Sequence, residues 1–180
     1  MKTLSSWCCL VLICVLPLLC ACSATPNSKN SEPLLLLKGP MTLTGTLTVG
    51  ESDFGIELHS ADGSTGTVSF TAPDSMKGYV FEKADDGYYV SYDDLRVPLK
   101  SGTIPGGAGI LFSLLSPNIT NIDTSEEEAN GLDLIVYTFP LGADGRLRVY
   151  TKKSDGTPLR AEFDSSLGSG VFHISEAKFE

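Results

Sequence analysis

The chain has 180 residues, a length typical of one domain. Its 22 acidic and 13 basic residues give a formal net charge of -9, which argues against nucleic acid as a main partner, because phosphate binding needs clustered Lys and Arg. Every cysteine lies at or before residue 22: Cys8, Cys9, Cys14, Cys20 and Cys22. The remainder of the chain therefore lacks the thiols that a disulfide, a cysteine metal site or a cysteine nucleophile requires.

Residues 1–21 have the pattern of a secretory signal. Lys2 supplies the positive start, and residues 10–19 are apolar but too few to span a bilayer, which takes about 20 such residues. The stretch ends in Leu19-Cys20-Ala21-Cys22, which resembles the bacterial lipobox. This resemblance implies a lipid on the Cys22 thiol and cleavage before it. The alternative is an ordinary signal peptide that has Cys22 by chance.

Residues 22–33 are expected to be the lipidated cysteine and a flexible tether, because they are polar and have no apolar periodicity. Two acyl chains are enough for stable anchoring to a bilayer. We therefore expect a membrane partner through Cys22 and a location on the extracytoplasmic face of the cell membrane, or on the outer membrane if the source has one.

Residues 34–180 are expected to form one domain rich in β-strands. Apolar and polar residues alternate with the period of two that strands show. Ten strands are predicted, at residues 41–49, 54–59, 68–70, 79–83, 88–93, 95–99, 132–139, 146–151, 158–163 and 171–179. Asp-Gly and Asn-Gly pairs favour tight hairpins between antiparallel strands, and they occur at residues 62–63, 86–87, 130–131, 144–145 and 155–156.

Two segments depart from the alternation. Residues 108–115 are apolar on almost every side, which predicts a buried helix. This helix is either a fixed part of the core or a mobile lid hinged at Gly106, Gly107 and Gly109. The acidic run from Glu126 to Glu128 lacks the ligand spacing of a calcium loop, so a solvated loop or a short helix start is predicted there.

The sequence contains no recognisable catalytic motif, so we expect no enzyme, no metal and no cofactor. Neither a nucleophile elbow nor a zinc-binding His-Glu-x-x-His is present. His59 falls on the face opposite Phe54, Ile56 and Leu58 and is expected to be exposed, whereas the face of His173 is ambiguous.

The order of features resembles the LolA/LolB lipoprotein-carrier superfamily. A strand runs into Gly66-Thr67-Val68-Ser69-Phe70-Thr71-Ala72-Pro73-Asp74-Ser75-Met76-Lys77-Gly78, and paired strands around Asp86-Gly87 carry Tyr88, Tyr89 and Tyr92. The apolar helix follows, and the chain ends in hairpins around Gly156-Thr157-Pro158-Leu159-Arg160. The resemblance implies a mainly β (α+β) fold, a strongly curved antiparallel half-barrel meander covered by a short apolar helix.

The resemblance also implies an apolar pocket for the acyl chains of lipids or lipoproteins. The candidate lining residues are Leu47, Phe54, Ile56, Leu58, Val68, Phe70, Phe81, Tyr92, Leu111, Leu114, Leu134 and Val136. The alternative is that they pack a dry core. Two features differ from the soluble carrier: Ala72 stands where the carrier has a basic residue that helps to hold its lid shut, and the lipobox anchors this chain.

Two functions are favoured, ahead of a third, an anchored hydrolase that would depend on His59 or His173. The first is a membrane-anchored lipoprotein that binds a lipid or an acylated ligand and acts in lipid or lipoprotein trafficking. The second is a non-catalytic interaction protein on the same fold, which binds or regulates an enzyme of the cell envelope or of the spore cell wall. The acidic surface and Ala72 favour the second slightly.

Overall fold

The structure is a computed structural model, and it describes residues 37–100, 106–115, 122–141, 144–165 and 168–180. The described residues all belong to the structural unit Ser31–Glu180. The predictions for the signal, the tether and the lipidation of Cys22 fall outside the described residues.

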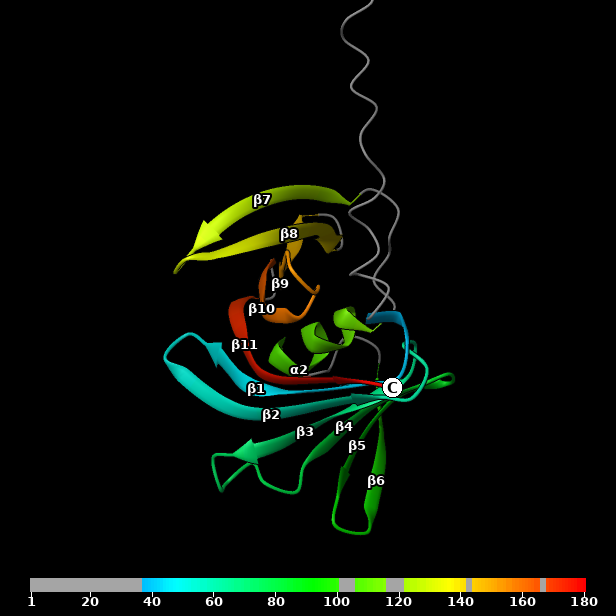
Figure 1. The fold of residues 1–180 in the computed structure, drawn as a ribbon. Coiled ribbons are helices and arrows are strands. Elements are labelled where there is room, and N and C mark those ends of the chain that lie inside the picture. The colour runs from blue at the N-terminus through cyan, green and yellow to red at the C-terminus, as the bar shows by residue number, and fades with distance from the viewer. Residues whose placement is uncertain (1–36, 101–105, 116–121, 142–143, 166–167) are drawn as a thin grey trace, which may run out of the picture. The chain divides into compact units, whose positions relative to one another are not determined.

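Within these residues, eleven strands form one antiparallel sheet (Figure 1). They are β1 (Met41–Val49), β2 (Ser52–Ser60), β3 (Gly66–Ala72), β4 (Val80–Ala84), β5 (Gly87–Tyr92), β6 (Leu95–Leu99), β7 (Asp123–Ala129), β8 (Leu132–Leu141), β9 (Gly145–Lys152), β10 (Pro158–Ser165) and β11 (Gly168–Phe179). A short α-helix, α2 (Gly106–Leu111), leads directly into the 3₁₀ turn η4 (Phe112–Leu114).

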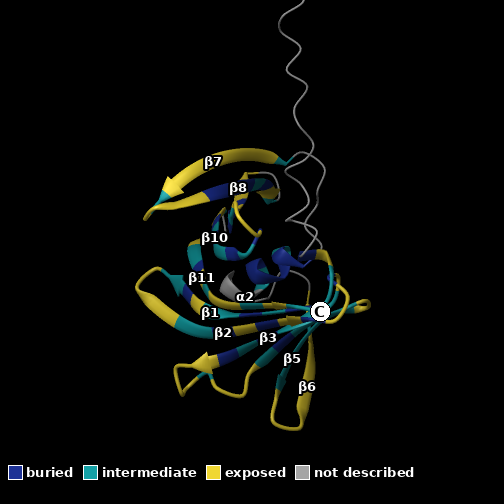
Figure 2. Ribbon diagram, in the orientation of Figure 1, coloured by how far each residue is buried: buried dark blue, intermediate teal, exposed yellow. Residues whose placement is uncertain are grey.

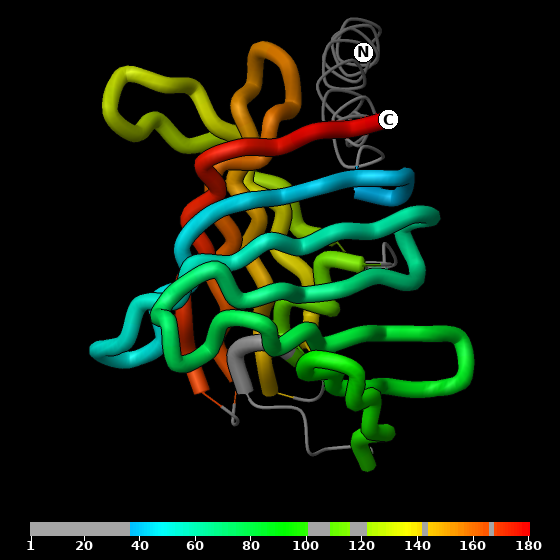
Figure 3. The backbone as a smooth tube through the Cα atoms, turned by 90° about the horizontal axis from the view of Figure 1, so that it is seen from below, coloured from blue at the N-terminus to red at the C-terminus, as the bar shows by residue number. Residues whose placement is uncertain are grey.

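The sheet is built from two meanders joined by the first and last strands. Its order is β6-β5-β4-β3-β2-β1-β11-β10-β9-β8-β7, and β1 pairs with β11 from Met41↔Phe179 to Val49↔Gly170. Figure 3 shows these two strands side by side. The strands that precede and follow α2, β6 and β7, therefore lie at opposite edges of the sheet.

The helix lies on the concave side of the strongly curved sheet, where most of the buried residues gather (Figures 1 and 2). Its apolar sequence explains this position, because a helix without a polar face must be buried. Ile110, Leu111, Phe112, Leu114 and Leu115 are all at least 93% buried. The prediction of a strongly curved antiparallel meander covered by a short apolar helix is confirmed.

Glycine and irregular pairing accompany the curvature. The β1–β11 register shifts between Thr44 and Gly45, and a Cβ at Gly45 would collide with the backbone carbonyl of His173. Only glycine allows the two backbones to approach so closely, and such irregularities bend strands and increase their twist. At Gly170 a Cβ would strike the ring of Phe163, so the absence of a side chain makes room for an aromatic core residue.

The predicted strands are all present, but one strand was not predicted. Asp123–Ala129 forms β7, so the prediction of an acidic loop or helix start around Glu126–Glu128 is wrong. The strand is almost wholly exposed, which explains why its sequence shows no alternation. The strand is formed by its pairing with β8, from Asp123↔Thr138 to Ala129↔Leu132, rather than by burial of its own side chains.

The predicted turns connect strands as expected. The Asn130-Gly131 pair joins β7 to β8 with positive φ at both residues, 54° and 74°, which is the backbone form that two-residue hairpins favour. Gly63 and Gly156 also have positive φ, 76° and 74°. Asp93, in the turn between β5 and β6, has a φ of 53° without a following glycine.

Candidate functional site on the concave face

The concave face is lined by one apolar cluster to which both meanders and the helix contribute. Strand alternation directs every second side chain of β1, β2 and β3 to this side. The buried members are Leu37, Met41, Leu43, Leu47, Ile56, Leu58, Val68, Phe70, Phe81, Ile110, Leu111, Phe112, Leu114, Leu115, Ile135, Tyr137, Phe139, Leu147, Val149, Ala161, Phe163 and Phe172. No member is more than 8% exposed, so the cluster is closed to solvent in this structure.

Most of the predicted pocket residues lie in this cluster. Buried members are Leu47, Ile56, Leu58, Val68, Phe70, Phe81, Leu111 and Leu114, and Phe54 packs against them while half-buried. The structure brings these residues together on one face. Their role as the lining of a ligand pocket stays a prediction.

Leu134 and Val136 occupy a different place from the predicted one. They form a second, small cluster with Tyr150, against which Ala129 and Leu159 pack. Their β8 neighbours Ile135 and Tyr137 point to the concave cluster, so Leu134 and Val136 must point to the convex side. Strand β8 is buried on both faces from Leu134 to Tyr137, so the predicted alternation of apolar and polar residues is wrong there.

A row of aromatic rings crosses the concave side of β2, β3 and β4. The Phe54 and Phe70 ring centroids are 5.8 Å apart, and the Phe70 and Phe81 centroids are also 5.8 Å apart, both in edge-on arrangements. A separate ring contact joins the helical segment to the sheet, because the Phe112 ring centroid in η4 lies 5.8 Å from that of Tyr88 on β5. Such pairs add about 0.5–1.5 kcal/mol each to the effect of burial.

Lys83 on β4 provides a polar contact to the end of the helical segment. Its Nζ donates a hydrogen bond of 3.4 Å to the Leu115 carbonyl. Burial lowers the pKa of Lys83, and the nearby Asp62 carboxylate opposes that effect.

Lys83 also borders a cavity of about 300 Å³, together with His59, Gly66 and Asp85. Ala72, which stands where the soluble carrier has a basic residue, is exposed. Lys83 was not predicted, because its position in a strand does not show that it contacts the helical segment.

Beyond the helix, the concave face continues as an exposed apolar surface over β4–β6. The tyrosine patch comprises Tyr79, Tyr92, Leu95 and Val97, which are 36%, 49%, 64% and 40% exposed. The Tyr79 and Tyr92 ring centroids lie 4.5 Å apart, and Tyr92 pairs with Leu95 across the strands. Val97 pairs with Val90, which packs against the main cluster, so the patch and the core share one face. Tyr92, predicted to line a pocket, is therefore an exposed member of the concave face.

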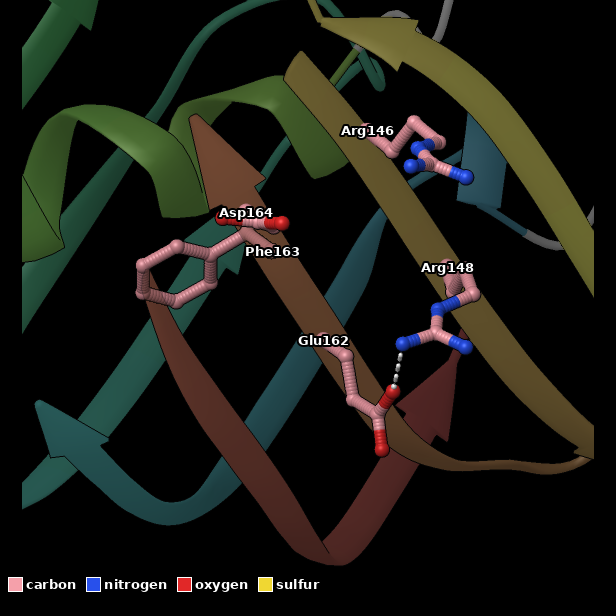
Figure 4. Close-up of a pocket in the computed structure, with 5 residues that line it drawn as sticks. All are labelled: Arg146, Arg148, Glu162, Phe163 and Asp164. Atoms are coloured by element: carbon pink, nitrogen blue, oxygen red, sulfur yellow. Dashed lines mark ion pairs between the residues drawn. The ribbon is translucent and has the colours of Figure 1, made fainter. Parts of the chain in front are cut away.

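The convex face carries a charged cluster on β9 and β10 (Figure 4). The Glu162 carboxylate accepts a 2.9 Å hydrogen bond from the Tyr150 hydroxyl and forms ion pairs of 2.9 Å with Arg148 and 3.1 Å with Arg160. The Arg160 guanidinium also lies 3.9 Å from the centre of the Tyr150 ring. Burial, followed by the bond to Glu162, raises the pKa of Tyr150, so this phenol holds its proton at neutral pH.

The same residues border a second cavity, of about 140 Å³, lined by Arg146, Arg148, Glu162, Phe163 and Asp164. Figure 4 shows the charged side chains on one side of the strands and the Phe163 ring on the other. Glu162 therefore has three donors, and its contacts with Tyr150 and Arg148 link strand β10 to strand β9.

The described residues contain no group of three or more His, Cys, Asp and Glu side chains placed to hold a metal ion. His59 and His173 are both exposed on strands, and His59 Nδ1 lies 3.1 Å from the Thr42 hydroxyl. None of the helices in the described part of the chain is long and apolar enough to cross a membrane.

Comparison with solved structures finds similar folds. An uncharacterised conserved protein from Thermus thermophilus superposes with a TM-score of 0.53 at 13% identity, covering 84% of this chain and 88% of that one. A putative outer membrane lipoprotein-sorting protein domain from Vibrio parahaemolyticus gives 0.49 at 16% identity, with coverages of 83% and 90%. A LolA superfamily protein from Nitrosomonas europaea gives 0.42 at 12% identity, with coverages of 83% and 93%.

The fold is consistent with the LolA-like curved meander that the sequence resemblance implied. The curved antiparallel sheet and the short helix on its concave side agree with what the sequence resemblance implied. No family model matches the chain, and no curated protein matches its sequence. At 13% identity, the similarity to the Thermus thermophilus protein concerns the fold alone.

Proposed function

We propose that the chain is a non-catalytic, lipid-anchored binding protein on the extracytoplasmic side of a bacterial membrane, and that its concave face takes an acyl chain of a lipid or of an acylated protein. The observation that carries the proposal is the concave apolar cluster with the α2–η4 segment lying in it. The lipobox-like sequence at Cys22 supports the anchor, and the LolA-like fold supports binding over catalysis.

The ligand would enter by replacing the helix contacts. Segment α2–η4 is only nine residues long, from Gly106 to Leu114, and apolar side chains provide most of its described contacts. An acyl chain offers the same chemistry, at about 0.8 kcal/mol for each CH₂ that it buries. A ligand of this kind can therefore take the place of the apolar Leu111 and Leu114 side chains, and the hydrogen bond from Lys83 to the Leu115 carbonyl is the polar contact that it would break.

The experiment is native mass spectrometry of the mature protein purified from its own envelope, followed by titration with an apolar fluorescent probe. We expect a bound lipid or a probe that binds saturably. Phe112→Ala should bind the probe more tightly, because it removes a ring that fills the concave face. Leu132→Ala, at a residue 43% exposed in the β7–β8 turn region, is the matched control and should bind unchanged.

A protein that carries no lipid and binds no probe would overturn this proposal. If such a protein also copurified in equal amounts with an enzyme of the cell envelope, the second function would replace it. The acidic surface favours that second function, in which the fold presents a surface to another protein.

A further inference from the structure

The tyrosine patch is apolar, exposed and bordered by acidic turns. Tyr92 and Leu95 flank the Asp93-Asp94 turn directly. The topology of an antiparallel meander places the β1–β2, β3–β4 and β5–β6 connections at the same end of the sheet. These connections and their borders carry the carboxylates of Glu51, Asp53, Asp74, Asp93 and Asp94 and the single basic residue Lys77.

Few of these negative charges are neutralised by the surrounding protein. Lys77 forms a 2.6 Å ion pair with Asp74, and Asp53 accepts a 2.7 Å hydrogen bond from the uncharged Thr48 hydroxyl. Asp93 and Asp94 are exposed. The end of the sheet next to the tyrosine patch therefore combines exposed aromatic and aliphatic side chains with a net negative charge.

We infer that the tyrosine patch docks a basic amphipathic segment of another protein, whose apolar side chains cover Tyr79, Tyr92, Leu95 and Val97 and whose Lys or Arg side chains meet Asp93 and Asp94. Tyrosine is a frequent anchor of protein interfaces because its ring buries area while its hydroxyl stays hydrated. Charge complementarity selects a basic partner and repels anionic lipid headgroups.

The segment docks on the face of the sheet rather than on its edge. Strand β6 is the last strand at its end of the described sheet, but Pro98 has no backbone N–H and interrupts the row of donors that another strand would need. On the other face of β6, Arg96 is held by Glu82 through bonds of 2.9 and 3.0 Å and lies over the Tyr89 ring. The exposed apolar side chains of β5 and β6 therefore lie on the concave side.

The test uses the full chain in phosphatidylcholine nanodiscs and a labelled synthetic peptide of leucine and lysine that forms an amphipathic segment. The control peptide has glutamate in place of every lysine. We expect saturable binding of the basic peptide and none of the acidic one. Tyr92→Ser with Leu95→Ser should weaken the affinity more than about tenfold, as expected for central anchors.

A matched pair of charge variants separates the patch from the overall acidity of the chain. Asp93→Asn with Asp94→Asn should weaken binding about fivefold, since Asn also tolerates the positive φ of residue 93. Glu127→Gln with Glu128→Gln removes the same charge from β7, at the opposite edge of the sheet, and should leave the affinity unchanged. Equal weakening by both pairs would overturn the inference.

A photo-reactive benzoylphenylalanine at position 92 locates the contact. It should cross-link the basic peptide, whereas the same residue at position 89, on the opposite face of β5, should not. Cross-linking at position 92 to phosphatidylglycerol in mixed nanodiscs, without cross-linking to the peptide, would overturn the inference in favour of a lipid surface. Probe binding to the concave core is measured separately, so failure of the docking site leaves the proposed acyl binding standing.

Discussion

At the scale of single residues, Asp62 organises the turn between β2 and β3. Its Oδ1 accepts hydrogen bonds of 2.8 Å from the backbone N–H groups of Ser64 and Thr65 and of 3.0 Å from the Thr65 hydroxyl. These donors, led by the Thr65 backbone, lower the pKa of Asp62 from 3.8 to about 2. Gly63 follows with the positive φ that the turn requires.

This arrangement predicts a pH-dependent effect of Asp62→Ala. The folded-state pKa lies below the unfolded value, so the carboxylate stabilises the fold above pH 3.8, and this contribution disappears as the pH falls towards 2. The difference in unfolding free energy between wild type and variant should be constant near neutral pH and shrink across that window. Urea unfolding at several pH values measures it. Asp62→Asn, which keeps an acceptor but does not titrate, should give a smaller difference that shrinks over the same pH window. A constant difference for Asp62→Ala would contradict the account.

Residue positions also mark what the sequence can predict. The alternation in β2 assigns Ile56 and Leu58 to the core and His59 to the exposed face, and the structure agrees. The same logic fails for Leu134 and Val136, because the β8 run Leu-Ile-Val-Tyr is apolar at every position. Alternation then shows which residues share a face, but it does not show which of the two faces is concave. The pairing of β8 with β9 and β7 decides that.

At the scale of elements, the sequence predicts the buried helix but not the hydrogen bond that holds its end to the sheet. Apolar residues around the whole circumference of 108–115 predict burial. The hydrogen bond from Lys83 to Leu115 joins residues that are 32 positions apart in the sequence, so no local sequence pattern predicts it. Strand β7 was missed for a related reason, since its stability comes from pairing with β8 rather than from burial of its own side chains.

Lys83→Met should loosen the helical segment while leaving the sheet intact. The variant keeps an apolar stem beside the core but loses the donor to the Leu115 carbonyl. Amide exchange of residues 110–115 should accelerate about threefold to tenfold, consistent with one net hydrogen bond. Because burial lowers the Lys83 pKa, removing the charge also relieves a cost to folding, so the global free energy of unfolding should change by less than about 1 kcal/mol.

Hydrogen exchange followed residue by residue separates these two effects. Arg96→Met, which removes a comparable basic side chain from the convex face, is the control and should leave exchange at residues 110–115 unchanged. Exchange in Lys83→Met that matches the wild type at those residues would show that the lysine does not hold the helix.

At the scale of the whole molecule, the order in which the strands are connected explains why a helix lies on the concave face. Consecutive strands β6 and β7 lie at opposite edges of the sheet, so the chain between them must pass from one edge to the other, and it carries α2 on the concave side (Figure 1). The edges themselves discourage further strands, through Pro98 in β6 and through the acidic side chains of β7. The concave face, rather than the edges, is therefore where we propose that a ligand binds.

The central claim is that an acyl ligand enters this face by displacing α2–η4. The most direct test is a cross-link that holds η4 to the sheet. Tyr88→Cys with Phe112→Cys places two thiols where ring centroids lie 5.8 Å apart, and Tyr89→Cys with Arg96→Cys is the matched pair on the convex face. After bridging with a short thiol cross-linker, we predict that the first variant loses binding of the apolar probe and that the second retains it. Full probe binding by the cross-linked Tyr88–Phe112 variant would contradict the account.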